Sequence, residues 1–360
     1  MSGPARIARL AALAIVTASL ASCGQNTHPA EPNTSAAKGA PNTAAPSVFA
    51  FTTDNGLSLV RDGAVISTVA TSSPPRHPVF TATGEYVAAT ADDGTILITG
   101  RDAESSRTIA AHATQVFADR GDTIAWWQGP NQLISLDLSQ PSSAPTSTVI
   151  GLPGGNPENT RLLSMADGIA VFARPDGSDG SEELIRMDRN QTFESLGPSP
   201  ETAHPIQITV PSPDGREFAY QSPIRAACPK SGVGVIDTQT GQFSSPALPS
   251  SIDSVATAST MWWDTDRALH IALATRPCGS DASSRSTVTT WKLDQDEWIR
   301  ADPADVLASR ALAGGQTALV TPTSTKPPRG TLWLDTGATR VQVADDVTDL
   351  ATPAVPIPNE

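Results

Sequence analysis

The stretch Ser212-Pro213-Asp214-Gly215-Arg216-Glu217-Phe218-Ala219-Tyr220 decides the fold, because it places a tight turn directly before a short apolar strand. Pro213 presets the φ angle that the turn needs, and the Asp214 side chain can bond back to the backbone. Gly215 supplies a conformation that other residues rarely adopt. The segment therefore predicts a hairpin between two antiparallel strands.

The same turn and strand recur along the chain, while helix signals are nearly absent after residue 48. Successive equivalent positions are 38, 45, 49, 51 and 49 residues apart. These positions are Tyr86, Ile124, Ile169, Phe218, Leu269 and Ala318. Further β-rich runs follow each of them. A unit of this length with about four short strands is typical of a β-propeller blade.

Six complete units and an incomplete first one can be counted. Residues 48–69 supply three short strands, and residues 346–351, after the last complete unit, offer a fourth. Pairing the two ends of the chain in one blade would close the ring and leave no free sheet edge. We therefore predict an all-β chain with a single propeller over residues 47–353, made of seven blades of four antiparallel strands. Six and eight blades are the alternatives, and residues 354–360 are expected to form a flexible tail.

Residues 212–220 also resemble the S-P-D-G-x-x-I-A-F signature of the TolB-type, WD40-like (PD40) propeller repeat. The resemblance implies the same fold for most of residues 47–353 by period, but the signature is complete in one blade alone. The Trp-Asp dipeptides and the Gly-His pair of true WD40 repeats are missing.

The N-terminal segment resembles the signal peptide of bacterial lipoproteins. Arg6 and Arg9 precede a mainly apolar stretch of eleven residues, 10–20, which is too short to span a bilayer but suits a secretory signal. Leu20-Ala21-Ser22-Cys23 then resembles a lipobox. The resemblance implies removal of residues 1–22 and lipid attachment, with acyl chains such as palmitate, at Cys23. An ordinary secretory signal that happens to contain a cysteine is the alternative.

Residues 23–46 are rich in Pro, Asn, Thr and Ala and have almost no apolar mass, so we expect a disordered tether. The net charge of −13 becomes −15 once the two arginines of residues 1–22 are removed. Such an acidic chain argues against nucleic acid and against charge-driven binding to anionic lipid. Contact with the membrane is therefore expected through the lipid on Cys23, at the outer face of the cell membrane.

With Cys23 acylated, Cys228 and Cys278 remain as a pair in an exported, oxidising setting. We predict a disulfide between them, in corresponding loops of the fifth and sixth blades. A reactive thiol or a metal-binding pair is the alternative, although no ligand lies at suitable spacing.

Five histidines occur, and three of them share a position. His77, His112 and His204 each lie just before the first strand of a blade, in loops that gather at one mouth of a propeller channel. Three imidazoles there could bind a metal or a small anion. The alternative is that blade repetition places similar residues at similar positions without a shared role. His270, on the second strand of its blade, is expected to be buried.

Signatures of catalytic nucleophiles, phosphate-binding loops and zinc hydrolases are absent. The acidic stretch 176–183 fails the spacing of a calcium loop and is expected to be a hairpin. The pairs Trp126-Trp127 and Trp262-Trp263 are expected to place one indole in the packing between sheets and the other elsewhere. An aromatic platform for a ligand is the alternative reading of these pairs.

We therefore expect a non-enzymatic, lipid-anchored extracytoplasmic propeller, without a cofactor, that binds or scaffolds an envelope protein or ligand. A propeller enzyme of the lactonase or sugar-active lyase type is one alternative, and would need convergence of groups such as Asp253, Asp305 and Asp349. A metal-binding chaperone is another.

Overall fold

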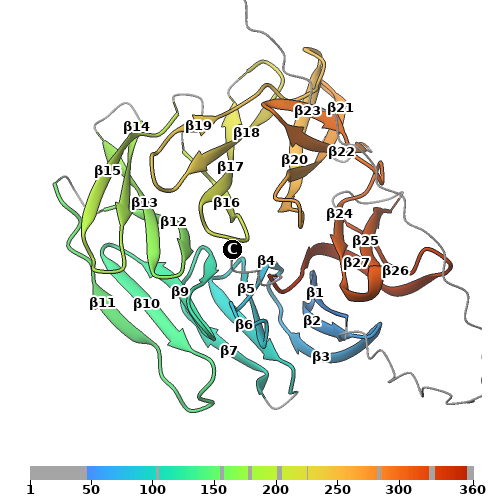
Figure 1. Ribbon diagram of the computed structural model, residues 1–360. Coiled ribbons are helices and arrows are strands. Elements are labelled where there is room, and N and C mark those ends of the chain that lie inside the picture. Colours follow the sequence, from blue (N-terminus) through green and yellow to red (C-terminus); the bar gives the residue numbers. More distant parts are fainter. Residues whose placement is uncertain are drawn as a thin grey trace, which may run out of the picture. The chain divides into compact units, whose positions relative to one another are not determined.

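The chain folds into short antiparallel strands joined by tight turns (Figure 1). The computed structural model describes residues 47–102, 105–154, 158–176, 181–200, 205–224, 226–281, 284, 286–323 and 329–354. The predicted signal peptide, Cys23, the tether, His204 and most of the predicted tail lie outside these residues. No helix of the described part is long and apolar enough to cross a membrane.

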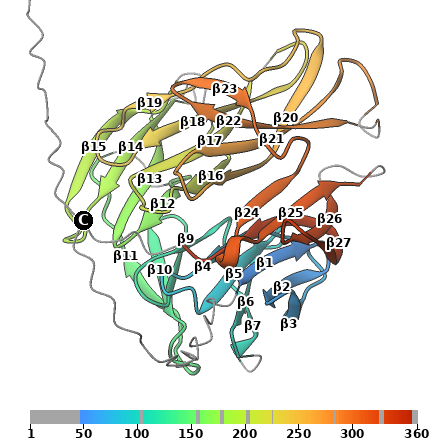
Figure 2. The ribbon, with the colours of Figure 1, turned by 45° about the vertical axis from the view of Figure 1, so that its right-hand side comes forward.

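The described strands pair into five sheets, three of four strands, one of seven and one of eight; dividing the two larger sheets at β27 and between β18 and β20 gives seven blades of four, arranged about a common centre (Figures 1 and 2). From the centre outwards they are as follows: blade 1, the end of β27 (Arg340–Ala351) with β1 (Val48–Thr53), β2 (Gly56–Arg61) and β3 (Ala64–Ala70); blade 2, β4 (Pro75–Phe80), β5 (Tyr86–Ala91), β6 (Thr95–Gly100) and β7 (Arg107–Ala110); blade 3, β8 (Val116–Ala118), β9 (Thr123–Gln128), β10 (Gln132–Asp137) and β11 (Thr146–Val149); blade 4, β12 (Arg161–Ala166), β13 (Ile169–Asp176), β14 (Ser181–Met187) and β15 (Phe193–Pro198); blade 5, β16 (Ile208–Pro211), β17 (Glu217–Ile224), β18 (Lys230–Asp237) and β19 (Phe243–Ser244); blade 6, β20 (Ser254–Trp263), β21 (Leu269–Pro277), β22 (Thr287–Asp294) and β23 (Glu297–Arg300); blade 7, β24 (Ala308–Ala311), β25 (Thr317–Pro322), β26 (Gly330–Asp335) and the start of β27.

Strand β27 belongs to two blades and closes the ring. Its first part pairs with β26, and its last residues pair with β1, so that Ala351 lies opposite Ala50. The strand passes from one blade to the next at Val347, which pairs with Gly330 of blade 7 on one side and with Thr53 of blade 1 on the other. The prediction that residues 346–351 supply the fourth strand of the first blade is confirmed, because β1 pairs with β27 on one side and with β2 on the other.

The hydrophobic core lies between neighbouring blades, as six clusters of buried side chains. In β1, Phe49 and Phe51 pack toward blades 6 and 7, whereas Val48 and Ala50 pack toward blade 2. Because both faces of a blade are covered, its strands are apolar without interruption rather than in alternation. This is why the chain shows short apolar runs bounded by polar turns.

The tandem tryptophans follow the same rule. Trp126 is buried in the cluster between blades 2 and 3, and Trp127 in the cluster between blades 3 and 4. Trp262 lies in the cluster around blade 7, and Trp263 packs against the core between blades 5 and 6. The expectation that one indole of each pair lies away from the packing between sheets is wrong, since each face of a blade meets another blade.

The turn at Ser212 has the predicted anatomy. Gly215 takes a left-handed φ of 67°, and the amide of Arg216 donates to Asp214 Oδ1 over 3.2 Å. A Cβ at position 215 would lie 2.5 Å from Ala166 Cβ in blade 4, so glycine is required by both conformation and space. Within the acidic stretch 176–183, residues 177–180 lie outside the described ranges, and β13 and β14 on either side of them pair as antiparallel strands with Asp176 opposite Ser181.

Candidate functional site

His77 lies inside β4, the first strand of blade 2, and not in the loop before it as the sequence predicted. The register with β5 shifts between Arg76 and Val79, and His77 takes a left-handed φ of 52° in this irregularity. The bulge redirects the imidazole, whose Nδ1 lies 3.7 Å from Oδ2 of Asp349 in β27. Burial lowers the pKa of His77, and the Asp349 carboxylate opposes that shift.

His112 lies, as expected, in the loop before β8, where it is exposed. The amide of the next residue, Ala113, donates to the carbonyl of Gly94 in the β5–β6 hairpin over 3.1 Å. Neither His77 nor His112 belongs to a group of three metal-ligating side chains within the described ranges. Because His204 lies outside those ranges, a shared site for the three histidines stays a prediction.

The three aspartates considered for catalysis have different surroundings. Asp349 lies in β27 rather than between blades, and faces His77. Asp305 pairs with Arg300, also exposed, over 3.0 Å. Asp253 accepts the amide of Cys278 through its main-chain carbonyl over 2.9 Å. No three-ligand group among the described side chains contains any of these aspartates.

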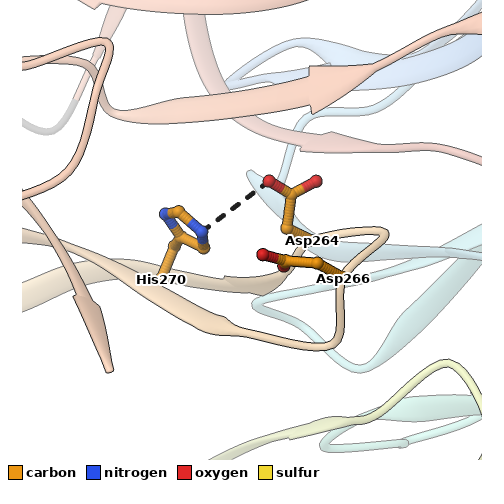
Figure 3. A group of neighbouring side chains, drawn as sticks. All are labelled: Asp264, Asp266 and His270. Carbon is orange, nitrogen blue, oxygen red and sulfur yellow. Dashed lines mark ion pairs between the residues drawn. The ribbon is translucent and has the colours of Figure 1, made fainter. Parts of the chain in front are cut away.

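One group that the sequence reading missed does converge (Figure 3). Asp264 and Asp266 in the β20–β21 hairpin of blade 6 lie beside His270 in β21, with ligand atoms all within 4.8 Å of one another. The sequence predicts only that His270 is a buried strand residue, and it is buried. The available signal was the spacing Asp-x-Asp-x-x-x-His across one tight turn, in which both carboxylates can reach back over the strand.

The hairpin is shaped like the one at Ser212, with Asp264 where that turn has serine. The Asp264 amide donates to the carbonyl of Ala268 over 3.0 Å, and Arg267 takes the left-handed φ of 64° that Gly215 takes in blade 5. Arg267 then reaches Asp214 of blade 5 over 2.7 Å. The turn is therefore held from both sides, by its own backbone and by the neighbouring blade.

His270 is fixed from two directions. It pairs with Trp262 across the sheet, and the two rings stack with centroids 5.4 Å apart and an interplanar angle of 19°. Its Nε2 lies 3.7 Å from Asp264 Oδ2. Burial lowers the pKa of His270, with Asp264 opposing the shift, so the protein environment favours the neutral imidazole. Two carboxylates and a neutral imidazole form a set of donors suited to a divalent cation.

Arg310 of β24 packs its guanidinium over the ring of Trp262. Its guanidinium carbon lies 5.3 Å from the centre of the indole, and Nη2 donates to the carbonyl of Leu350 over 2.9 Å. Burial lowers the pKa of Arg310 to about 10, so it remains a cation at neutral pH. The inner strands of blades 6, 7 and 1 are thereby linked by one charged side chain.

A second feature lies on the loops that join the second and third strands of blades 5 and 6. Cys228 and Cys278 form a disulfide there, with Cα atoms 5.5 Å apart, as the cysteine count predicted. The blades are also joined at this point by a parallel bridge between Lys230 and Ala256. Two isoleucines near the disulfide are exposed: Ile224 at the end of β17, and Ile252 in the loop that joins blade 5 to blade 6.

Several solved structures are similar to the chain, and the first of those described here supports the fold. The β-propeller domain of Cps50 (Swd1) from Myceliophteria thermophila matches with a TM-score of 0.51 and 11% identity, over 76% of this chain and 90% of that one. TolB from Acinetobacter baumannii has a TM-score of 0.41 and 16% identity, over 84% and 65%. Apo AztD from Citrobacter koseri has a TM-score of 0.46 and 12% identity, over 85% and 98%. No family model and no curated protein matches the chain. By its fold, the chain is a β-propeller.

Proposed function

We propose that the chain is a lipid-anchored extracytoplasmic binding module, and that it docks an envelope protein on the loop surface around the Cys228–Cys278 disulfide. We call this surface the stapled face; it comprises Ile224, Cys228, Lys230, Ile252, Arg276 and Cys278. The disulfide supports an exported location, because such bonds persist in oxidising compartments.

The observation that carries the proposal is the pair of exposed isoleucines on an ordered surface. The side chain of Ile252 is 83% exposed and that of Ile224 39%. Lys230 connects them: it pairs with Ile224 across the β17–β18 hairpin, and its Nζ donates to the carbonyl of Ser251 over 2.9 Å. Because the disulfide and the Lys230 hydrogen bond already tie these loops together, a partner that covers the isoleucines has less ordering to impose on them.

Charge indicates the chemistry of the partner. In a chain of net charge −13, Lys230 and Arg276 lie at this face without a carboxylate partner in the part that the structure describes. Arg276 instead donates to the carbonyls of Ser280 and Asp281, over 2.9 Å each. A protein segment with apolar and acidic side chains would complement both the isoleucines and the cations.

Site-specific photo-crosslinking in cells tests the docking proposal. A photo-reactive residue placed near position 252 should capture one defined envelope protein from cells that make the full chain. Ile252→Asp, which changes only an exposed side chain, should abolish that product, and Lys230→Glu should weaken it at least tenfold. Val341→Asp is the matched control, because Val341 is 55% exposed on blade 7, away from the stapled face.

Equal capture by the Ile252→Asp and Val341→Asp proteins would overturn the docking proposal. Anchoring is tested separately by fractionation. The wild-type chain should partition with membranes and the Cys23→Ala chain should be released in soluble form; a Cys23→Ala chain that stays with membranes would show the anchoring proposal to be wrong.

A further inference from the structure

We infer that Asp264, Asp266 and His270 form a binding site for one divalent transition-metal ion, with Zn²⁺ as the ion that we would use to test it. The site lies on the hairpin between the first and second strands of blade 6. It is formed by a different turn of that blade from the one that carries the disulfide, and it is independent of the proposed docking surface.

The spacing of the ligand atoms is close to that of an occupied site. Ligands about 2.1 Å from a tetrahedral ion lie about 3.4 Å from one another. His270 Nε2 and Asp264 Oδ2 are 3.7 Å apart, and all three groups offer an atom within 4.8 Å of the others. Small side-chain rotations therefore suffice to bring the three donors to an ion between them.

The histidine supplies the independent indication that the cluster takes a ligand. The side chain of His270 is only 9% exposed, and its Nε2 has no hydrogen-bond partner among the described residues. A buried polar nitrogen without a hydrogen-bond partner has lost its contact with water and gained nothing in exchange, which is unfavourable. Figure 3 shows that this nitrogen points at the Asp264 carboxylate, into the space that the two aspartates border. A metal ion there would satisfy it.

Both carboxylates are held in position through their Oδ1 atoms. Asp264 Oδ1 accepts the amide of Thr265 over 2.7 Å, and Asp266 Oδ1 accepts the amide of Ala268 over 3.1 Å. The Trp262 ring holds the imidazole by stacking. The three donors thus need little ordering when an ion binds, which favours affinity.

Lys292 occupies one donor in the metal-free protein. It pairs with His270 across β21 and β22, and its Nζ donates to Asp266 Oδ2 over 2.6 Å. Its side chain is 30% exposed, so the ammonium can move into solvent when an ion takes its place. Lys292 should therefore compete with the metal for Asp266. If Asp264, Asp266 and His270 bind a metal, removing the Lys292 charge should strengthen that binding; a purely structural charge cluster would show no such gain.

The mixed donor set selects the class of metal. Mg²⁺ and Ca²⁺ prefer sites made of oxygen alone, whereas imidazole favours Zn²⁺ and its first-row neighbours. Three protein ligands leave a coordination position for water, as in open zinc sites. We accordingly expect Zn²⁺ and Co²⁺ to bind and Ca²⁺ not to compete with them.

Calorimetric titration of the full chain with Zn²⁺, together with the visible absorption of Co²⁺, tests the assignment. We expect one ion per chain, a tetrahedral or five-coordinate Co²⁺ spectrum, and a Tm that rises with Zn²⁺ concentration. Asp264→Asn, which keeps the shape of a partly exposed side chain, should weaken binding at least tenfold. His270→Gln should do the same, and Lys292→Gln should strengthen binding several-fold by removing the competing cation.

Asp294→Asn is the matched control, because it removes an exposed negative charge near Lys292 without removing one of the three donors. It should leave the affinity within twofold of that of the wild type. Absence of saturable binding by the wild-type chain would overturn the inference. So would undiminished binding by a folded Asp264→Asn chain, since the ion would then be held elsewhere.

Discussion

Thr52 and Thr348 are 296 positions apart in the chain, yet their side-chain oxygens share a hydrogen bond of 2.9 Å. The contact joins β1 to the end of β27 within blade 1, where Leu350 also pairs with Phe51. The two ends of the propeller are thus held as neighbouring strands of one sheet, and the stability of the ring depends on the last strand.

Leu350 gives a direct test of that closure. Its side chain is 1% exposed in the cluster that joins blades 6, 7 and 1. Leu350→Ala should lower the free energy of unfolding by about 2–5 kcal/mol. Val341→Ala on the same strand, at an exposed position, should change it by less than about 0.5 kcal/mol. Urea unfolding measures both changes. If Leu350→Ala lowered the free energy of unfolding as little as Val341→Ala does, the closure of the ring through β27 would be contradicted.

Removing the disulfide should destabilise the fold through the unfolded state. A bridge that spans 50 residues lowers the entropy of the unfolded chain, which raises the free energy of unfolding by about 4 kcal/mol on the chain-entropy model. Cys228→Ser, Cys278→Ser and the double variant should therefore all unfold at lower urea concentration, to a similar extent. Reduction of the wild-type chain should reproduce their midpoint, and reduction should leave the double variant unchanged; a midpoint insensitive to reduction would contradict this prediction.

The signature glycine should be less replaceable than a glycine in a similar turn. Gly215→Ala introduces both an unfavourable left-handed φ, about 1 kcal/mol, and a Cβ 2.5 Å from Ala166 Cβ. Gly337 has a φ of 79° but no atom within 4 Å of the added carbon, so Gly337→Ala involves the conformational cost alone. Thermal unfolding should show a clearly larger fall in Tm for Gly215→Ala. Equal falls in Tm would mean that the close approach to Ala166 in blade 4 adds nothing to the cost of replacing Gly215.

His77 should make the propeller less stable in mild acid. Burial lowers the pKa of His77 in the folded chain, while Asp349 and Asp92 oppose that shift and Arg76 adds to it. The unfolded side chain has a pKa of about 6.5 and takes up its proton first as the pH falls. The contribution of neutral His77 is therefore complete above about pH 6.5 and is lost as the pH falls below it.

Two variants isolate this contribution in urea unfolding measured between pH 8 and pH 5. His77→Asn tolerates the left-handed φ of 52° and should flatten the decline in the free energy of unfolding. Asp349→Asn removes the carboxylate that favours the charged imidazole, and should steepen the decline. A decline that His77→Asn leaves unchanged would assign the pH dependence to other groups.

Much of the fold could be predicted because its determinants are local. The turn at Gly215, the recurrence of the turn, and the cysteine parity are all readable within a few residues or from simple counts. The use of residues 346–351 in blade 1 followed from counting strands. The position of His77 could not be predicted in this way, because a β-bulge depends on how two strands settle against each other.

The sequence by itself determined the blade period and the turn chemistry, because both depend on spacing along the chain, and the cysteine count indicated the pairing of Cys228 with Cys278. Only the tertiary structure decided which side chains meet. It buried both indoles of Trp126-Trp127 in different interfaces, since each blade is packed on two faces. It also turned Asp264 and Asp266 back toward the unpartnered nitrogen of His270, through a hairpin that blade 5 helps to hold. Contacts of that kind depend on strand register and neighbouring blades, which no local pattern specifies.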